Sequence, residues 1–314
     1  MTKRHILTFE SFDDWDQVPM EEQYIVHNLP YGASVESLSD AAIANVEAFA
    51  FKGHSTLGAD IIDAFPKLGM IANYGVGYDT IDVAHASSKG IRVTNTPDVL
   101  TEDVADLAVG MVIAASRGMA DADRWVRSGD WGTKGPYPLG RKVSGKRVGI
   151  VGLGRIGRAV AERLQPFGMQ ISYSSRSAKD TPGWTHYDDI VAMARDADIL
   201  VVTLSGGPET QGMVTKEAIE AVGPEGVLVN ASRGTTVDEA ALLDALESGA
   251  LWRAGLDVYL NEPHINPRFR TLSNVVLQPH QSSGTFETRK AIGQLQRDNL
   301  AAYFAGQPLV TPVN

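Results

Sequence analysis

Residues 147–157 read RVGIVGLGRIG and lead from an apolar segment into a glycine-rich turn. The continuous apolar run at 147–151 is typical of a parallel strand buried on both faces. The pattern at 159–167 predicts an amphipathic helix that ends at Gly168. A strand, a Gly-x-Gly-x-x-Gly turn and a helix in this order are the context in which this motif binds a dinucleotide.

Each glycine of the turn has a separate physical task. Gly152 permits the tight turn, Gly154 lets the backbone approach a pyrophosphate, and Gly157 lets the helix sit close to the sheet. The free N–H groups at the helix N-terminus then point at the phosphates. The sequence therefore predicts a dinucleotide site here, and the alternative is an ordinary glycine-rich strand-to-helix turn.

Composition restricts the classes of partner. The chain has 314 residues, a formal net charge of −10 and no cysteine. An acidic chain argues against a nucleic-acid partner, and the lack of cysteine excludes disulfides and thiolate chemistry. No metal site is predicted, because none of the seven histidines has a metal-ligand spacing to another histidine or to an acid. We expect no membrane partner and a cytoplasmic location, since no apolar run could span a bilayer and Glu10 breaks the N-terminal apolar run early.

Strand patterns alternate with helical patterns in two series, which predicts an α/β protein with two Rossmann-like lobes. The first series has strands expected at 6–9, 24–26, 48–51, 70–72 and 91–94. The second is a six-strand series expected at 147–151, 170–173, 199–203, 226–230, 255–259 and 275–278, with helices near 187–195, 216–221 and 238–247. We expect a doubly wound, parallel-sheet dinucleotide-binding domain at 99–286. Residues 1–98 and 287–314 would form a smaller, flavodoxin-like substrate-binding domain.

A long helix is predicted near Thr101, between the two series. Its apolar residues occupy more of its circumference than a surface helix needs. Two interpretations are open: part of this helix is buried in a second subunit, or it is a core helix of the chain itself.

The end of the second strand of the nucleotide-binding series bears on cofactor choice. An NAD site normally has a carboxylate there, but residues 174–177 read SSRS. Hydroxyls and a guanidinium suit a 2′-phosphate, which a carboxylate would repel. The sequence therefore favours NADP(H). The alternative is that Arg176 is a solvated loop residue, which leaves NAD(H) open.

Three polar residues follow three successive strands of the same series. Arg233, Glu262 and His280 stand where the carboxyl ends of parallel strands meet, at the edge where open α/β sheets bind ligands. Taken singly, each could be a surface ion-pair partner, a loop acid or a strand-end histidine. Together they form an acid–base set: His280 can pass a proton, Glu262 can orient the imidazole, and Arg233 can hold a carboxylate or polarise a carbonyl.

The motifs around these residues resemble those of the D-isomer-specific 2-hydroxyacid dehydrogenases. The resemblance covers nearly the whole chain. It is carried by residues 152–157, NASRG at 230–234, GLDVY at 255–259, NEP at 261–263, PH at 279–280, NTP at 95–97 and LVTPV at 309–313. It implies that His280 is the acid/base, Glu262 its partner and Arg233 the anchor of the substrate carboxylate.

The resemblance also implies two lobes closing on a cleft, and a homodimer built around the helix near Thr101. Within the family, residues 175–177 and GGPET at 206–210 are most similar to NADPH-preferring glyoxylate/hydroxypyruvate and hydroxyphenylpyruvate reductases. Many relatives carry PLTPET where this chain has LSGGPET at 204–210, so the pocket wall beside the cofactor is not predicted in detail. The residues expected to bind the cofactor are Gly152, Gly154, Arg155, Ile156, Ser174, Ser175, Arg176, Ser177, Thr203, Leu204, Pro208, Thr210, Ala231, Ser232, Asp257 and Ser283.

The first series is expected to complete the substrate pocket. Residues 73–79 read NYGVGYD, so successive N–H groups can converge on a carboxylate. By resemblance, Val76 and Gly77 are the donors, and the alternative is a plain connecting turn. His54 either lines the pocket or is a solvated loop histidine.

Two functions are compatible with these residues. The first is NADPH-dependent reduction of a 2-oxo acid, of the glyoxylate/hydroxypyruvate type, to the D-2-hydroxy acid. The second is a corepressor-like interaction protein that senses a dinucleotide on the same fold. The set Arg233, Glu262 and His280 favours the enzyme, because a sensor needs no proton chemistry.

Overall fold

The computed structural model describes residues 3–53 and 55–314, which form two compact units. Unit 1 spans Met1–Leu100 and Gly284–Asn314, and unit 2 spans Thr101–Ser283. The chain passes from unit 1 to unit 2 after residue 100 and returns to unit 1 after residue 283. The domain boundaries predicted from the sequence follow residues 98 and 286. In the described part of the chain, no helix is both long and apolar enough to cross a membrane.

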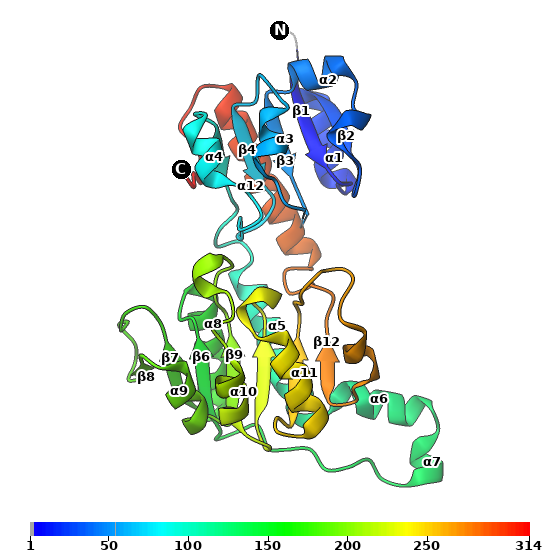
Figure 1. Ribbon diagram of the computed structural model, residues 1–314, viewed down its shortest axis with the longest axis vertical. Helices are drawn as coiled ribbons and strands as arrows, with labels where there is room; N and C mark the ends of the chain where they lie inside the picture. The colour runs from blue at the N-terminus through cyan, green and yellow to red at the C-terminus, as the bar shows by residue number, and fades with distance from the viewer. Residues whose placement is uncertain (1–2, 54) are drawn as a thin grey trace. The chain divides into compact units, whose positions relative to one another are not determined.

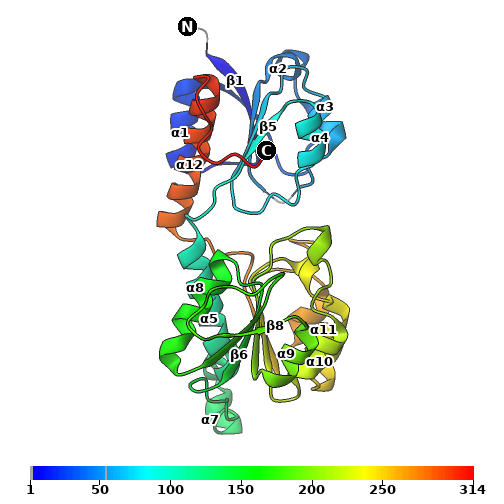
Figure 2. The same cartoon turned by 90° about the vertical axis from the view of Figure 1, so that its left-hand side faces the viewer.

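Unit 1 is a parallel five-stranded sheet in the order β2-β1-β3-β4-β5, which is the flavodoxin-like order (Figure 1). The strands are β1 Arg4–Phe9, β2 Tyr24–Leu29, β3 Ala48–Phe51, β4 Met70–Asn73 and β5 Arg92–Thr94. The helices are α1 Asp14–Gln23, α2 Asp40–Asn45, α3 Ala59–Asp63, α4 Val83–Ser88 and α12 Phe286–Phe304, with a 3₁₀ turn at Val35–Ser37. Figure 2 shows α1 and α12 on one face of this sheet and α2, α3 and α4 on the other.

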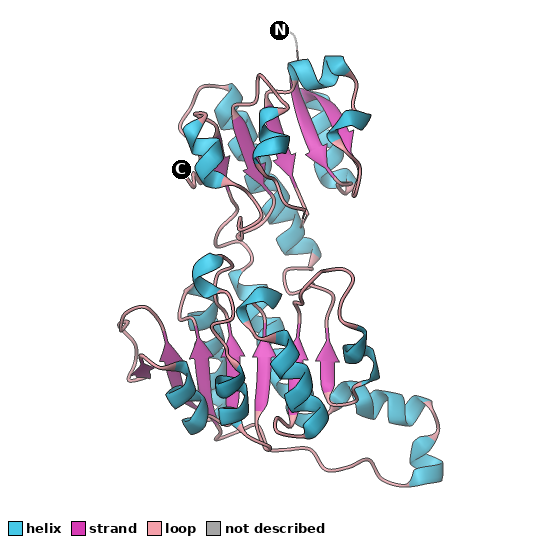
Figure 3. Cartoon of the chain, in the orientation of Figure 1, coloured by secondary structure: helices cyan, strands magenta, loops and turns pink. Residues whose placement is uncertain are grey.

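Unit 2 is a parallel seven-stranded sheet in the order β12-β11-β10-β9-β6-β7-β8 (Figure 3). The strands are β6 Arg147–Val151, β7 Gln170–Ser174, β8 Thr185–Tyr187, β9 Ile199–Val202, β10 Val227–Asn230, β11 Arg253–Leu256 and β12 Val275–Leu277. The helices are α5 Thr101–Arg117, α6 Met119–Arg127, α7 Asp130–Lys134, α8 Arg155–Leu164, α9 Ile190–Asp196, α10 Lys216–Val222 and α11 Glu239–Ser248. Shorter 3₁₀ turns lie at Gln165–Phe167, Pro208–Thr210, Gly234–Thr236 and Pro267–Thr271.

Burial explains the strand sequences. Every residue of β9 and β10 is buried, because α5 and α8 cover one face of the unit 2 sheet and α9, α10 and α11 cover the other (Figure 2). The prediction of an α/β fold with two parallel sheets is confirmed.

The six-strand prediction for the nucleotide-binding series is wrong by one strand. The structure adds β8, which pairs with β7 through Ser172 and Thr185 at the edge of the sheet. A strand of three residues is too short to show a period of two in the sequence. The helix expected from residue 187 therefore begins at Ile190, after Asp189 has capped it by accepting a hydrogen bond from the N–H of Val191.

The long apolar helix near Thr101 is a core helix of unit 2. It is α5, and it packs on α8, β10 and β11. Its residues Val104, Ala105, Ala108, Val109, Met111, Val112, Ala115 and Ser116 are buried within the chain. The apolar surface that made this helix look like a subunit contact is thus covered by the unit itself.

Candidate active site

The glycine turn lies at the point where the strand order of unit 2 reverses. β6 pairs with β7 on one side and with β9 on the other, so the carboxyl end of β6 opens at the switch point of the sheet. Gly152 has a φ of +96°, a backbone conformation that residues other than glycine rarely adopt. The Thr203 hydroxyl, which follows β9, donates to the carbonyl O of Gly152 at 2.8 Å and holds the two strand ends together.

The turn is crowded where it meets the helix and open where a ligand would approach. A Cβ on Gly157 would collide with the carbonyl O of Gly152 and would lie 2.7 Å from the Thr203 hydroxyl. A Cβ on Gly154 would meet no atom of the described residues within 4 Å. Gly154 precedes Arg155 and Ile156, the first residues of α8, whose backbone N–H groups lie at the positive end of the helix dipole. These residues fit a pyrophosphate.

The end of β7 is polar and carries no acid. Ser174 is the last residue of the strand, and the Ser175 hydroxyl donates to the carbonyl O of Ser177 at 2.7 Å. The Arg176 side chain is exposed in the loop that comes next.

The other predicted cofactor residues also follow strands of this sheet. Leu204 comes after β9, and Pro208 and Thr210 form a 3₁₀ turn in which the Thr210 hydroxyl donates to the carbonyl O of Ser205 at 2.7 Å. The buried residues Ala231 and Ser232 come directly after β10. Ser283 stands in the turn after His280, at the last residue of unit 2.

His280 and Glu262 form a hydrogen-bonded pair. Nδ1 of His280 lies 2.7 Å from Oε2 of Glu262, and the side chains are 22% and 17% exposed. The other carboxylate oxygen, Oε1, accepts from the N–H of Tyr259 at 2.7 Å. An ionised carboxylate can only accept, so Nδ1 carries the proton toward Glu262 and Nε2 is the ring nitrogen that can act on a ligand.

The backbone that presents His280 is held in an uncommon conformation. His280 has a φ of +52°, in the left-handed region that residues other than glycine seldom occupy. Its N–H donates to the carbonyl O of Asp257 at 2.8 Å. The carboxylate of Asp257, which is fully buried, accepts from the N–H groups of Gln281 at 2.6 Å and Ser282 at 3.0 Å. Three bonds to one aspartate therefore fix the turn that carries the imidazole.

Asp257, for which the sequence predicts a cofactor contact, has a task in the fold. Both of its carboxylate oxygens accept backbone N–H groups of the histidine turn. The sequence does contain a signal for this task. An acid stands directly after the apolar strand β11, whose last residue, Leu256, pairs with Asn230, the last residue of β10. A buried acid in that place needs hydrogen-bond donors.

Arg233 is fixed through its own backbone. The side chains of Asn230 and Thr236 donate to its carbonyl O at 3.0 and 2.7 Å. A Cβ on the next residue, Gly234, would collide with the backbone of Tyr259, so the arginine loop packs directly on the loop that leads to Glu262. Nη1 of the half-buried guanidinium donates to the carbonyl O of Ser232 at 2.9 Å. The loops of Arg233, Glu262 and His280 thus lie together at one edge of the sheet.

In unit 1, side-chain amides organise the turn predicted to bind a carboxylate. Nδ2 of Asn73 donates to the carbonyl O atoms of Gly75 and Gly77 at 3.0 and 2.9 Å, and Nδ2 of Asn95 donates to that of Val76 at 2.9 Å. In a trans peptide the N–H points opposite the C=O. The N–H groups of Val76 and Gly77 therefore face away from the two asparagines.

A neighbouring loop of unit 1 contains a lysine that no sequence motif singles out. Nζ of Lys52 donates to the carbonyl O of Ser11 at 2.9 Å and lies 5.1 Å from the ring centre of Phe12. Burial lowers the pKa of Lys52 from its ordinary value. His54, for which the sequence predicts either a place in the pocket or a solvated loop position, lies outside the described residues.

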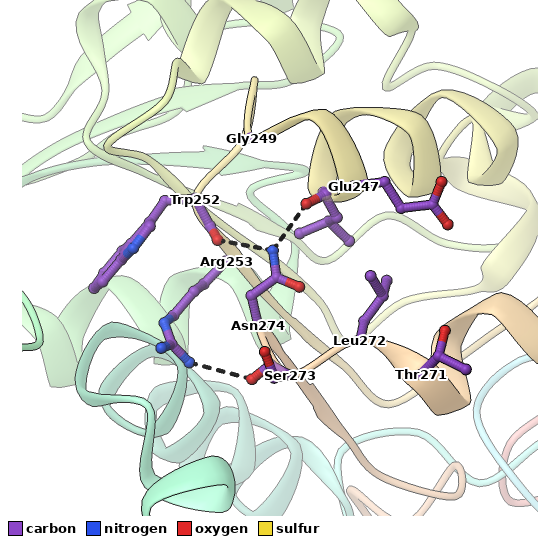
Figure 4. A pocket seen from close by; sticks show the side chains of 9 residues that line it. Glu247, Gly249, Trp252, Arg253, Thr271, Leu272, Ser273 and Asn274 are labelled. Atoms are coloured by element: carbon purple, nitrogen blue, oxygen red, sulfur yellow. Dashed lines mark hydrogen bonds between the residues drawn. The ribbon is translucent and has the colours of Figure 1, made fainter. Parts of the chain in front are cut away.

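A second candidate is a pocket at the amino ends of the unit 2 strands, opposite the carboxyl ends that carry the predicted site residues (Figure 4). It lies at the amino ends of β11 and β12, where Nδ2 of Asn274 donates to the carbonyl O atoms of Leu246 and Trp252 at 3.0 and 3.1 Å. The Arg253 guanidinium points to the carbonyl O of Ser273. None of the predicted site residues that the structure describes lines this pocket, so the carboxyl edge is the better candidate.

The family model described as D-isomer specific 2-hydroxyacid dehydrogenase, NAD binding domain, matches residues 109–282. The chain is 51% identical over 263 residues to the hydroxyphenylpyruvate reductase of Plectranthus scutellarioides, covering 83% of this chain and 84% of the relative.

Two solved structures are similar over essentially their full length. The 2-hydroxyacid dehydrogenase of Ketogulonicigenium vulgare Y25 is 50% identical, with a TM-score of 0.92 and coverage of 100% of this chain and 99% of that one. The NADPH-dependent glyoxylate/hydroxypyruvate reductase of Sinorhizobium meliloti, in complex with NADP and malonate, is 39% identical, with a TM-score of 0.93 and coverage of 99% and 97%.

These relatives are reductases and a dehydrogenase, and they lend no support to the dinucleotide-sensing alternative. The matched family model is that of a nicotinamide dinucleotide domain and covers the glycine turn, Arg233, Glu262 and His280. The chain therefore belongs to the D-isomer specific 2-hydroxyacid dehydrogenase family and is an oxidoreductase that uses a nicotinamide dinucleotide.

Proposed function

We propose that the chain reduces a 2-oxo acid of the glyoxylate or hydroxypyruvate type to the D-2-hydroxy acid, with NADPH as the preferred cofactor. The observation that carries this proposal is the His280–Glu262 pair, joined at 2.7 Å at the sheet edge that also bears the glycine turn. The hydroxyphenylpyruvate and glyoxylate/hydroxypyruvate reductase relatives support the substrate class.

Each group of the set has one task. When bound, the nicotinamide supplies the hydride. His280, protonated at both ring nitrogens, donates the proton of Nε2 to the carbonyl oxygen of the substrate as the alkoxide forms. Glu262 holds Nδ1 and stabilises the charged imidazole before the transfer. Arg233 binds the substrate carboxylate and stabilises the negative charge that develops on the carbonyl oxygen.

The pyrophosphate of the cofactor would bind at Gly154, Arg155 and Ile156, where the turn is open at Gly154 and the helix begins. The polar end of β7 supports NADPH over NADH, because the Arg176 guanidinium can donate to a 2′-phosphate and no carboxylate stands at the strand end to repel it. The NADPH dependence of the Sinorhizobium meliloti relative supports the same choice. NADH remains a weaker alternative cofactor in this proposal.

The N–H groups of Val76 and Gly77 are proposed to bind the substrate carboxylate. Their orientation away from Asn73 and Asn95 supports this role, since the two asparagines hold the carbonyl side of these peptides and the N–H groups lie on the other side.

We also propose a homodimer, formed through segment 119–139 instead of through α5. Every residue of α6 is at least partly exposed, and α6 and α7 extend away from the unit 2 sheet (Figure 1). The exposed apolar side chains of this segment are Met119, Val126, Trp131 and Leu139. Exposed apolar side chains gathered in one segment are typical of a protein interface.

Sedimentation equilibrium of wild type and of the double variant Val126→Glu/Trp131→Glu tests the proposed dimer. A wild-type dimer that becomes a monomer in the double variant supports the proposal. A wild-type monomer contradicts it.

A substrate panel tests the activity. Initial rates of NADPH and NADH oxidation are measured with glyoxylate, hydroxypyruvate, hydroxyphenylpyruvate and 2-ketobutyrate. We expect turnover of at least one 2-oxo acid, with a higher kcat/KM for NADPH than for NADH. A lower KM for NADH than for NADPH would overturn the cofactor preference, and no turnover with any 2-oxo acid would overturn the function.

A further inference from the structure

The loop between β7 and β8, residues 175–184, is built around a buried tyrosine hydroxyl. Tyr173 lies on β7 and is 1% exposed. Its hydroxyl accepts from the N–H of Lys179 at 2.8 Å and donates to the carbonyl O of Lys179 at 3.2 Å. Both backbone groups of one lysine are therefore held by a single side chain of the sheet.

The far half of the loop is anchored separately. Nη2 of Arg158, on α8, donates to the carbonyl O of Asp180 at 2.6 Å, and its guanidinium lies 5.7 Å from the ring centre of Trp184. Trp184 is 8% exposed, so it ties the end of the loop to the unit. The loop is thus fixed on both sides of Lys179.

The side chain of Lys179 returns toward the end of β7. Its Nζ lies 3.5 Å from the Ser177 hydroxyl, and the Ser175 hydroxyl donates to the carbonyl O of Ser177 at 2.7 Å. His186, on β8, lies 3.1 Å from the carbonyl O of Ser175 through Nε2 and fixes the near side of this chain of contacts. Ser175, Ser177 and the ammonium of Lys179 therefore form one polar cluster.

From this geometry we propose that Lys179 is a second cation of the 2′-phosphate site and that the Tyr173 hydroxyl positions it. The inference rests on the proposed preference for NADPH. A phosphate dianion presents more acceptor oxygens than Arg176 and two serine hydroxyls can satisfy, and an ammonium is a compact point charge suited to the remainder. Arg176 lies between the two serines in the chain and Lys179 contacts the second of them, so both cations can face one phosphate.

Lys179 is exposed, as a cation that meets a ligand must be, while its backbone is fixed. Both backbone groups of Lys179 are held by the hydroxyl of Tyr173, a fully buried side chain. The acids nearest in the chain are Asp180 and Asp188, and the carboxylate of Asp188 lies 3.8 Å from Nδ1 of His186. The ammonium itself contacts the Ser177 hydroxyl.

The test uses full-length Lys179→Ala, Lys179→Arg, Tyr173→Phe and Arg176→Ala, with Lys142→Ala as the matched control. Lys142 is an exposed lysine of unit 2 that precedes the amino end of β6, at the other edge of the sheet. Dissociation constants of NADPH and NADH are measured by fluorescence titration, with adenosine 2′-monophosphate and adenosine 5′-monophosphate as competing probes.

We expect Lys179→Ala to raise the Kd of NADPH and of adenosine 2′-monophosphate about 10-fold, which is the loss of affinity expected when one charge-assisted hydrogen bond is removed. The Kd values of NADH and the 5′-monophosphate stay within about 2-fold, the scatter of near-neutral surface changes. Lys179→Arg retains most of the NADPH affinity. Tyr173→Phe weakens NADPH by a smaller factor and leaves NADH unchanged, a split that general loosening of the fold would not produce.

The outcomes distinguish the two proposals. If wild type prefers NADPH and Arg176→Ala weakens it while Lys179→Ala does not, the inference about Lys179 is wrong and the proposed cofactor stands. Equal loss of NADPH and NADH in Lys179→Ala also overturns it. A wild type that binds NADH more tightly than NADPH overturns the cofactor proposal itself.

Discussion

The two units carry glycine-rich turns that look alike in sequence and differ in the element that comes next along the chain. In unit 1, Gly75–Gly77 comes after β4, and the next helix, α4, begins only at Val83 and has six residues. In unit 2, the turn after β6 leads directly into α8, a helix of ten residues that begins at Arg155. A helix N-terminus attached to the turn supplies several N–H groups and a dipole, which suits a pyrophosphate.

In the proposed function, unit 1 supplies a smaller site for the same physical reason. Its turn offers two adjacent N–H groups, oriented by Asn73 and Asn95. That number of donors suits a carboxylate. The comparison teaches that a parallel sheet determines where a turn opens, and that the segment after the turn determines which anion it can hold.

The largest effect we predict concerns the acid–base pair, which belongs to unit 2. His280→Ala removes the proton donor and should lower kcat by about 10² to 10⁴-fold, with the Kd of NADPH unchanged. Steady-state rates together with fluorescence titration measure both quantities. His85→Ala is the control, because His85 pairs with Asp63 on the surface of unit 1. Near-normal kcat in His280→Ala with every 2-oxo acid would contradict the assignment of the proton donor.

The second prediction separates the two glycines of the unit 2 turn. Gly157→Ala places a methyl group against the backbone of Gly152 and should destabilise the fold by about 1 to 3 kcal/mol while weakening cofactor binding. Gly154→Ala meets open space in the protein, so it should keep the Tm and lose only cofactor affinity. Thermal unfolding and NADPH titration measure the difference. If the two variants lose the same stability, the two glycines do not have the separate tasks inferred here.

The third prediction concerns the end of β7. Arg176→Ala should raise the KM for NADPH about 10-fold, because one charge-assisted contact with the 2′-phosphate is lost. The KM for NADH should not change. Initial rates with both cofactors measure the ratio, and parallel increases for NADPH and NADH would indicate that Arg176 does not read the phosphate.

The smallest predicted effect lies in unit 1. Asn73→Ala removes two hydrogen bonds to the carbonyl groups of the turn and should raise the KM of the 2-oxo acid by about 3- to 10-fold, as expected for one or two neutral hydrogen bonds. The KM for NADPH should stay as in wild type. Asn45→Ala is the control, since its Nδ2 donates to the carbonyl O of Ala41 within α2. An unchanged KM of the 2-oxo acid would mean that this turn only connects two elements.

The comparison also shows how far sequence patterns reach. The turn at 152–157 and the position of His280 can be predicted, because local chain geometry and the carboxyl edge of a parallel sheet follow from short patterns. β8 cannot, because an edge strand of three residues has no periodicity to detect. The sequence does not decide what covers the apolar surface of α5, because an apolar helix has the same sequence pattern in the core of a chain and in a subunit interface.

Contacts between distant residues are the hardest to predict. The carboxylate of Asp257 holds the turn of residues 280–282, and the Tyr173 hydroxyl holds the backbone of Lys179. Both depend on which side chains the fold brings into register across separate segments. Sequence spacing alone does not contain that information.

The most direct measurement follows the transferred hydrogen. The wild-type chain is supplied with hydroxypyruvate and NADPH deuterated at C4 of the nicotinamide, with each C4 epimer used in turn, and the product is analysed by NMR and by chiral chromatography. We predict D-glycerate with one deuterium at C2 from one of the two epimers. L-glycerate would contradict the proposed D configuration of the product, and glycerate without deuterium from either epimer would contradict direct hydride transfer to the 2-oxo acid.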